Sequence, residues 1–185
     1  MLNSVVQYFP DIDYLMAVLQ EAVRLVSPGG KIFLGDVRHL GLLPMFHSAV
    51  QLSRAAATVS VGLLRKRIAR AIEQEKELVI DPQFFQVLPG RLPGIGAVEV
   101  QLKRGRAPNE LTRYRYDVVL HTGEQIGTRA YEPLEWQTDV RSAPELEAAL
   151  VERRWCAVRL HSIPNPRLAR DRKSTRLNSS HPYRS

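Results

Sequence analysis

Residues 4–36, SVVQYFPDIDYLMAVLQEAVRLVSPGGKIFLGD, decide the fold. The run SVVQYF at residues 4–9 is β-branched and aromatic and stops at a proline, which predicts a strand that enters a loop. Apolar residues then recur at helical spacing over residues 14–26, and Asp11 or Asp13 can cap the helix that this pattern predicts. The stretch therefore begins with a strand followed directly by a helix.

A Pro-Gly-Gly turn at residues 28–30 ends this helix, and the apolar run KIFLGD at residues 31–36 predicts a short buried strand. Strand, helix, turn and strand in this order form a βαβ unit, whose right-handed crossover places both strands parallel in one sheet. The sequence therefore predicts the α/β fold class.

The rest of the chain supplies helices and further strands. Residues 42–77 are mostly helical in pattern, apolar at first and then basic and amphipathic, and a short helix can follow over residues 81–88. Residues 97–103 and 113–121 predict two strands, which a connection this short should join as an antiparallel hairpin. Residues 131–172 predict a strand, a serine-capped helix and another strand, which would form a small α/β appendix.

The last segment, KSTRLNSSHPYRS at residues 173–185, has no hydrophobic period and resembles a translated sequencing-adapter scar. We expect it to be foreign to the fold and disordered, and we expect the chain to be a fragment at both ends. Lys173, Arg176 and Arg184 of this segment raise the formal net charge to +7, and without them it is +4. A nucleic-acid-binding module, which rests on charge alone, loses its main support.

The composition excludes several classes of protein. The single cysteine, Cys156, can form neither a disulfide framework nor a paired-cysteine metal site, and it indicates a reducing, cytoplasmic setting. The sequence has no apolar run of roughly 18 residues or more and no signal-peptide pattern, so we expect no membrane span. It also lacks the nucleophile elbow, Walker loop, GxGxxG, HExxH and CxxC motifs, and we expect no metal site.

Polar side chains follow the predicted strands at the edge where open α/β sheets bind ligands, the carboxyl ends of parallel strands. Three segments qualify, the third only if the first hairpin strand runs parallel to the sheet. They contribute Gln7, Tyr8 and Phe9; Asp36, Arg38 and His39; and Asn109, Glu110, Arg113 and Tyr114.

These residues also have structural explanations. Asp36 and Arg38 can cap a loop or form surface ion pairs, and His47 can be a histidine at the boundary of the core rather than a base or a ligand. The basic run at residues 65–70 fits the solvated face of a helix. The segment KRGRAPNELTRYRY at residues 103–116 is denser in charge and is the better candidate for an anionic ligand or a phosphate-bearing carrier.

Five blocks in order carry a more specific signal. They are LNSVVQYFP (2–10), VSPGGKIFLGDVRHL (26–40), FHSAVQL (46–52), VEVQLKRGRAPNELTRYRYDVVLHTG (98–123) and IPNPRLARD (163–171). Together they resemble, over residues 2–172, the methyltransferase domains embedded in non-ribosomal peptide synthetases. Those domains resemble class I S-adenosylmethionine-dependent methyltransferases, whose seven-stranded sheet ends in an antiparallel strand pair.

The resemblance implies a partial Rossmann-like sheet with a helical lid. Residues 4–9 would be the fourth strand, 31–36 the fifth and 97–121 the sixth and seventh, while the glycine-rich cofactor loop would precede Met1. The implied domains are residues 1–125, the C-terminal half of the methyltransferase domain; residues 126–172, the appendix that leads to the next synthetase segment; and residues 173–185, the scar.

The resemblance also assigns site residues. S-adenosylmethionine would be the cofactor, bound by Asn3, Ser4 and Phe9. The substrate-binding residues would be Asp36, Arg38, His47, Asn109 and Tyr114. Glu110 would be the catalytic base, with Asn3 or Tyr8 positioning the acceptor by hydrogen bonds. The family often has a histidine before the Asn109–Glu110 pair, where this chain has Pro108.

The implied function is methylation, on nitrogen more than on carbon, of an aminoacyl or peptidyl intermediate tethered to a carrier protein in secondary-metabolite biosynthesis. Its partners would be adjacent adenylation and carrier domains, with no nucleic acid and no membrane. Lys103, Arg104 and Arg106 would suit an acidic carrier. The alternative is an inactive truncated fragment, because the glycine-rich half is absent and the strand at residues 4–9 would be an open edge.

Overall fold

The structure, a computed structural model, describes residues 1–124, 131–155 and 157–168. These fall into two compact units, residues 1–124 and residues 131–168. The predictions on Cys156 and on residues 173–185 lie outside the described residues. Within the described ranges, every helix is too short or too polar to cross a membrane.

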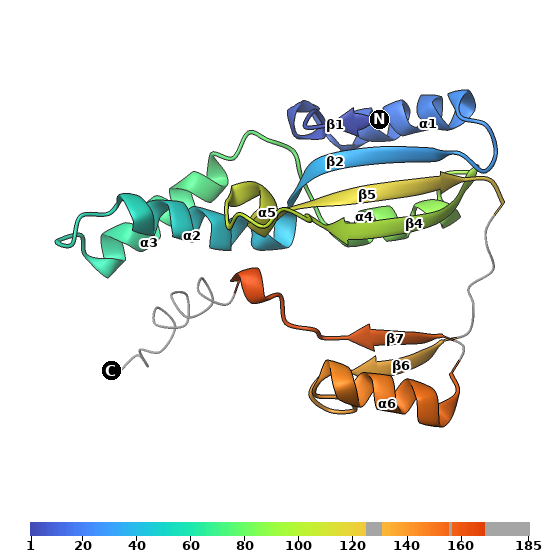
Figure 1. Cartoon of the computed structure of the whole chain (residues 1–185). Coiled ribbons are helices and arrows are strands. Elements are labelled where there is room, and N and C mark those ends of the chain that lie inside the picture. Colours follow the sequence, from blue (N-terminus) through green and yellow to red (C-terminus); the bar gives the residue numbers. More distant parts are fainter. Residues whose placement is uncertain (125–130, 156, 169–185) are drawn as a thin grey trace, which may run out of the picture. The chain divides into compact units, whose positions relative to one another are not determined.

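A mixed sheet organises the first unit (Figure 1). Its strands are β1 (Leu2–Asn3), β2 (Lys31–His39), β4 (Ile95–Leu102) and β5 (Arg115–Thr122) in the order β1-β2-β5-β4, with the short β3 (Val79–Ile80) paired to the end of β2. β1 and β2 pair directly and in parallel, and α1 (Ile12–Leu25) connects them along the chain. This confirms the βαβ unit and the α/β class.

The direction of β4 decides where the polar strand ends meet. β5 is antiparallel to β4, which confirms the predicted hairpin, and β5 is also antiparallel to β2. β4 therefore runs parallel to β1 and β2. The carboxyl ends of these three strands share one edge of the sheet, which is the condition that the third predicted segment needed.

The prediction of a strand at residues 4–9 was wrong. β1 covers only Leu2–Asn3, Ser4 has a left-handed φ of 56°, and Val6–Tyr8 form a 3-10 turn. The N–H of Ser4 still donates to the Gly35 carbonyl at 3.1 Å, but the left-handed residue turns the chain away from the sheet. Val6 and Gln7 are then buried from within a turn. Tertiary packing has overridden the β propensity of this run.

The helices of the first unit follow the predicted pattern. The side chain of Asp11 caps α1 by accepting the Tyr14 N–H at 2.8 Å, and α1 ends before the Pro-Gly-Gly turn, where Gly29 has a φ of 79°. α2 (Leu43–Arg54) packs on α3 (Val61–Glu73), and both extend past the end of the sheet where β2 stops (Figure 1). The remaining helices are α4 (Pro82–Gln86) and α5 (Glu110–Tyr114).

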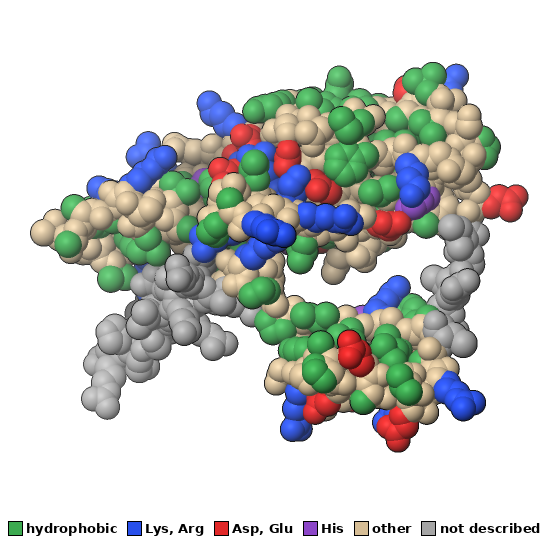
Figure 2. Space-filling model, viewed as in Figure 1, with side chains coloured by type: hydrophobic (Ala, Val, Ile, Leu, Met, Phe, Trp, Pro, Cys, Tyr) green, Lys and Arg blue, Asp and Glu red, His purple; other side chains and the backbone are tan. Residues whose placement is uncertain are grey.

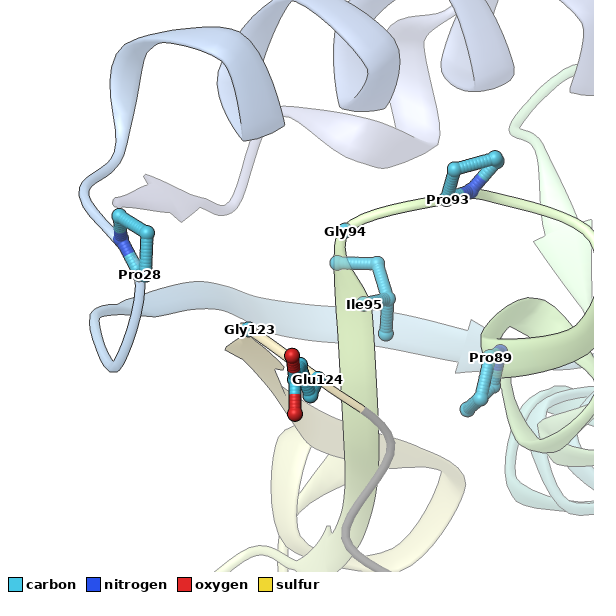
Figure 3. Close-up of a pocket in the computed structure, with 7 residues that line it drawn as sticks. All are labelled: Pro28, Pro89, Pro93, Gly94, Ile95, Gly123 and Glu124. Atoms are coloured by element: carbon cyan, nitrogen blue, oxygen red, sulfur yellow. The ribbon is translucent and has the colours of Figure 1, made fainter.

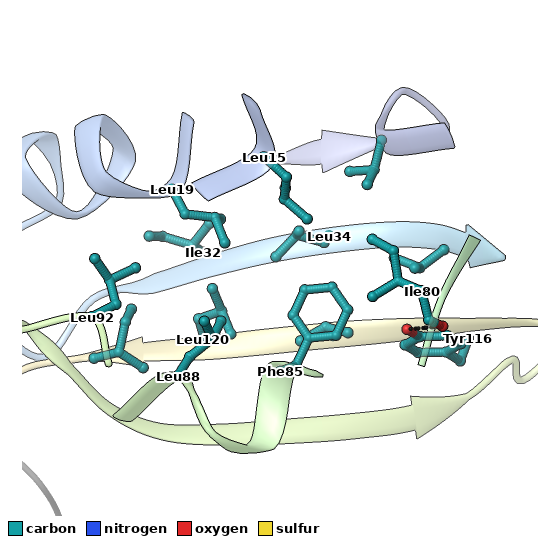
Figure 4. Close-up of a cluster of buried hydrophobic side chains, with 14 residues drawn as sticks. Leu15, Leu19, Ile32, Leu34, Ile80, Phe85, Leu88, Leu92, Tyr116 and Leu120 are labelled. Carbon is teal, nitrogen blue, oxygen red and sulfur yellow. Dashed lines mark hydrogen bonds between the residues drawn. The ribbon is translucent and has the colours of Figure 1, made fainter. Parts of the chain in front are cut away.

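One apolar core joins α1 and α4 to the sheet (Figure 4). Leu15 and Leu19 of α1 and Phe85 of α4 are fully buried in it. Each such side chain stabilises the fold by about 1.5–3 kcal/mol. Tyr116 of β5 brings a polar group into this core, and its hydroxyl donates to the Ile80 carbonyl at 3.0 Å. The core therefore fixes β3 against β5 as well as α1 against β2.

A bulge separates the apolar part of β2 from its charged end. Leu34 pairs with Val118 and Val37 with Tyr116, so three steps along β2 match two steps along β5. Asp36 lies in the bulge with a left-handed φ of 61°. Because the bulge adds one residue, Leu34 and Val37 can both be buried in the core.

The second unit is a strand, a helix and a strand, as predicted. β6 (Glu132–Glu135) and β7 (Val158–His161) pair in parallel, and α6 (Ala143–Arg153) connects them. Ser142 caps α6, since its hydroxyl accepts the N–H of Glu145 at 3.3 Å.

Candidate functional site

Four side chains at the shared carboxyl edge form one polar cluster, which we call the strand-end cluster: Ser4 after β1, Asp36 in β2, Lys103 after β4 and Asp117 in β5. The Ser4 hydroxyl donates to Asp36 Oδ2 at 2.5 Å. Lys103 Nζ lies 2.8 Å from Asp36 Oδ1 and 2.9 Å from Asp117 Oδ1. The backbone N–H of Asp36 donates to Asp117 Oδ1 at 3.0 Å. Side chains thus connect β1, β2, β4 and β5 at this edge.

The charged side chains of this cluster are largely shielded from water, and their contacts shift the pKa values of Asp36 and Lys103. The side chains of Asp36, Asp117 and Lys103 are 11%, 15% and 19% exposed. Burial raises the pKa of Asp36, but the hydrogen bonds from Lys103 and Ser4 outweigh it and hold that pKa below its ordinary value. Burial lowers the pKa of Lys103, but the hydrogen bonds to Asp36 and Asp117 outweigh it and hold that pKa above its ordinary value. At neutral pH Asp36 is a carboxylate and Lys103 an ammonium.

Asn3, the last residue of β1, lies directly beside Gly35. A Cβ atom at Gly35 would come within 2.0 Å of Asn3 Oδ1 and within 2.8 Å of the Phe33 ring. Glycine is therefore needed for the Asn3 amide to reach this position. The edge then presents two exposed polar side chains in succession, Asn3 and Ser4.

A second group of charged residues lies where β2 and β5 meet the helices. We call it the helix-clamp cluster: Arg38, His47, Glu75, Glu77, Glu110 and Arg115. Arg38 Nη1 lies 3.0 Å from both Glu75 Oε2 and Glu77 Oε2. Its guanidinium also stacks 4.8 Å from the centroid of the Phe46 ring in α2. Arg38 thus connects β2 to the segment that follows α3 and to α2.

The rest of the helix-clamp cluster extends this connection on both sides. His47 Nε2 lies 3.1 Å from Glu75 Oε2. Burial raises the pKa of Glu75, but hydrogen bonds from the backbone, the Arg38 charge and the His47 contact outweigh it and lower that pKa. Arg115 Nη2 pairs with Glu110 Oε1 at 2.7 Å and lies 3.9 Å from Glu77 Oε2. Ion pairs therefore contribute to holding the helical segment to the sheet.

The structure brings several of the predicted site residues into these two clusters. Ser4 and Asp36 meet in the strand-end cluster, and Arg38, His47 and Glu110 meet in the helix-clamp cluster. Gln7 supports the first, because its amide donates to the Ser4 carbonyl at 3.0 Å. Tyr114 supports the second, because it is buried with its ring edge-on to Phe46 at 5.4 Å.

Other predicted residues lie outside the clusters. Tyr8 is 72% exposed in its turn, and Phe9 packs edge-on against Tyr14 with ring centroids 4.9 Å apart. Asn109 is the cap of α5, where its Oδ1 accepts the Thr112 N–H at 3.1 Å. His39 accepts the Gly41 N–H through Nδ1 at 3.1 Å.

Sequence reasoning did not single out several cluster members: Glu75, Glu77, Arg115 and Asp117. The sequence does contain a sign of Asp117's role, because a carboxylate within the largely apolar run of β5 needs a polar partner. Lys103 was expected in an exposed basic surface, but its side chain is occupied by two aspartates. Arg104 and Arg106 of the same loop are exposed, and Figure 2 shows Lys and Arg side chains gathered around α5, with Asp and Glu between them.

A cavity of about 580 Å³ lies at the opposite edge of the sheet (Figure 3). Its lining comprises Pro28, Pro89, Pro93, Gly94, Ile95, Gly123 and Glu124. Prolines and glycines offer little catalytic chemistry, so the clusters at the carboxyl edge are the stronger candidate site. Among the described residues, no group of three or more His, Cys, Asp or Glu side chains is placed to hold a metal ion.

Comparison with known proteins connects the chain to one class of enzyme. It is 44% identical over 178 residues, 92% of the chain, to chondramide synthase cmdD of Chondromyces crocatus. It is 42% identical over 135 residues, 72% of the chain, to the nonribosomal peptide synthetase asqK of Emericella nidulans, and 38% identical over 139 residues, 73% of the chain, to cyclosporin synthetase simA of Tolypocladium inflatum.

The matched region is a small part of each relative: 4% of chondramide synthase, 5% of asqK and 1% of cyclosporin synthetase. No protein-family model matches the sequence. The synthetase part of the predicted resemblance is confirmed. The homologues of this chain are nonribosomal peptide synthetases, of which it corresponds to one short segment.

Proposed function

We propose that the chain is the C-terminal half of an S-adenosylmethionine-dependent methyltransferase domain of a nonribosomal peptide synthetase. It would methylate, on nitrogen more than on carbon, an aminoacyl or peptidyl intermediate tethered to a carrier protein. The observation that carries this proposal is the common carboxyl edge of β1, β2 and β4, where Asn3, Ser4 and Asp36 come together. The antiparallel β4–β5 pair at the end of the sheet and the synthetase homologues support it.

The residues at this edge fit part of the proposed cofactor. Bound S-adenosylmethionine would supply an electrophilic methyl group on a sulfonium cation. Ser4 Oγ and the Asn3 amide offer oxygen atoms that suit a cation, and Phe9 would contribute apolar contact. The sequence has no GxGxxG motif, so these residues would hold only the reactive end of the cofactor.

The chain's own residues would bind and orient the methyl acceptor. Methyl transfer needs the acceptor in line at roughly 3 Å, and correct placement supplies much of the rate. Asn3 and Tyr8 would hold the acceptor by hydrogen bonds. Asp36, Arg38, His47, Asn109 and Tyr114 would form the acceptor pocket.

Glu110 is the proposed base, and its ion pair with Arg115 limits when it can accept a proton. Its carboxylate is 42% exposed and paired with Arg115 at 2.7 Å. It would accept the acceptor's proton only after the Glu110–Arg115 ion pair opens or after a movement of α5 carries Glu110 to the acceptor. An amine acceptor must only be neutral, so this modest basic help is sufficient on nitrogen.

The carrier protein and the adenylation domain of the synthetase would be the partners. The exposed Arg104 and Arg106 would meet an acidic carrier, whereas Lys103 is occupied within the strand-end cluster. The single cysteine fits a cytoplasmic location.

The test joins the chain to the N-terminal half of such a methyltransferase domain and uses tritium-labelled S-adenosylmethionine with alanyl-pantetheine as the acceptor. We expect saturable binding of the methyl donor and transfer of label to the amine, with Asp36→Asn reducing transfer at least tenfold. Lys66→Met, on the exposed face of α3, is the control and should retain the wild-type rate. If the folded joined domain neither binds the donor nor transfers label, the proposed function is wrong. The chain by itself should transfer no label, as the alternative of an inactive truncated fragment states.

A further inference from the structure

The Ser4 hydroxyl has its only proton already engaged. A serine hydroxyl carries one proton and two lone pairs, and a carboxylate can only accept hydrogen bonds. Because Asp36 is ionised, the Ser4 proton must lie between Ser4 Oγ and Asp36 Oδ2. Ser4 is an exposed residue. Toward solvent, its oxygen therefore offers lone pairs alone and acts as a hydrogen-bond acceptor.

Lys103 and Asp117 fix the group that imposes this orientation. Lys103 contacts the Asp36 carboxylate oxygen that Ser4 does not use, and Asp117 accepts the backbone N–H of the same residue. Asp36 therefore has both its carboxylate and its backbone held. With Lys103 in place it remains ionised and cannot rotate to offer a proton to Ser4.

The backbone at this edge is strained as well as fixed. Ser4 and Asp36 have φ values of 56° and 61°. A non-glycine residue in this region costs about 1–3 kcal/mol and persists only where the surroundings determine it. Apolar residues of similar volume often stabilise a protein as well as buried ion pairs do, so stability alone does not require these charges. The arrangement thus favours geometry at Ser4 over stability.

We propose that Lys103 and Asp117 are positioning residues which, through Asp36, hold Ser4 Oγ as a pure acceptor for an N–H group of a bound ligand. This inference rests on the proposed function and extends it: Ser4 Oγ has two lone pairs, so besides the cofactor contact given above it can accept the N–H of the methyl acceptor. A ligand with the same shape but no hydrogen-bond donor leaves Ser4 Oγ without a partner and binds less well.

The experiment measures binding of two matched probes to the whole 15N-labelled chain by NMR, without any methyl donor. Alanyl-pantetheine carries an amine, and propionyl-pantetheine lacks it. We expect the alanyl probe to bind about tenfold more tightly, which is the effect of one good hydrogen bond, and to shift the backbone amides of residues 3–5. Lys103→Met and Asp117→Asn should each abolish the preference, while Lys103→Arg should restore part of it.

Several outcomes would overturn the inference. They are equal binding of the two probes, failure of either probe to bind, or a preference that survives in both Lys103→Met and Asp117→Asn. Lys66→Met is the matched control and should keep the preference. If the chain prefers the alanyl probe but the joined methyltransferase domain transfers no methyl group from S-adenosylmethionine, the proposed function is refuted and the hydrogen-bond assignment at Ser4 stands.

Discussion

Different groups connect the strands at the two ends of the sheet in the first unit, the carboxyl edge and the edge opposite it. At the carboxyl edge, charged side chains connect Ser4, Asp36, Lys103 and Asp117. At the opposite edge, uncharged groups make the connections: the N–H of Gly29 donates to the Thr122 carbonyl at 2.7 Å, the N–H of Gly123 donates to the Gly94 carbonyl at 2.9 Å, and the Thr122 hydroxyl donates to the Ser27 carbonyl at 2.7 Å.

This difference distinguishes contacts that only end the strands from contacts that we assign to the functional site. Glycines and prolines with backbone hydrogen bonds are enough to end strands and return the chain, as the edge around Gly29 and Gly94 shows. The carboxyl edge instead keeps partly buried ions and two left-handed non-glycine residues, which cost free energy that simple closure would not require. Strain and buried charge together mark the edge where we place the site.

Lys103→Met breaks the carboxyl edge most directly. It leaves two carboxylates, Asp36 and Asp117, close together without their cation. We expect a loss of about 3 kcal/mol in the free energy of unfolding of the first unit. Hydrogen exchange of the β2 and β5 amides measures it. Both tryptophans of the chain, Trp136 and Trp155, lie in the second unit, so their fluorescence would report on the wrong unit.

Lys66→Met controls for the general loss of a lysine and should change the same free energy by less than about 0.5 kcal/mol. A loss of that small size in Lys103→Met itself would show that the carboxyl edge is held by its backbone, as the opposite edge is, and the comparison would fail.

Gly96→Ala breaks the opposite edge. Gly96 lies in β4, and a Cβ atom there would come within 2.2 Å of the Glu124 carbonyl oxygen. Backbone has to move to accommodate it, so we expect a loss of about 1–3 kcal/mol, measured by exchange of the β4 amides. Gly62→Ala in α3 is the matched control, because nothing lies within 4 Å of its Cβ. It should be neutral or stabilising by up to about 1 kcal/mol, and an equal loss in both variants would contradict the assignment.

Acid should weaken the carboxyl edge through Asp36, with the smallest effect of the three. The folded-state pKa of Asp36 lies below its unfolded value of 3.8, so its contribution to stability is present above that value and is lost as the pH falls through the folded pKa. The free energy of unfolding of the first unit, measured as the pH falls from about 6 to about 2, should show this loss, and Asp36→Asn should flatten it.

Asp13→Asn, an exposed substitution in the first turn of α1, is the control for this titration and should keep the wild-type slope. If Asp36→Asn and Asp13→Asn follow the same curve, the strand-end cluster does not set the acid stability of the sheet.

The sequence predicted the elements that depend on local patterns. The helix after Asp11, the Pro-Gly-Gly turn and the β4–β5 hairpin are governed by periodicity, caps and turn residues, and they are present. The strand at residues 4–9 failed because a single left-handed residue, Ser4, ends the pairing that its neighbours favour.

The candidate site was predictable only in part, for the same reason. Asp36 and Arg38 could be proposed because they follow a buried strand. Their partners could not, because Lys103, Asp117 and Glu75 come near them only through the strand order and the bulge in β2. A sequence pattern records spacing along the chain, whereas the hydrogen bonds of the strand-end cluster join residues 32 and 81 positions apart.

The strand order also has a consequence for how the molecule folds. β4 and β5 are joined by a short connection, so their hairpin can close early, within microseconds for an isolated hairpin. β5 meets β2 only across the whole of residues 40–114, a much larger loop whose closure costs more entropy. Until that pairing forms, Asp117 and Lys103 are on one piece of structure and Ser4 and Asp36 on another. The strand-end cluster is therefore complete only once this long-range pairing has formed.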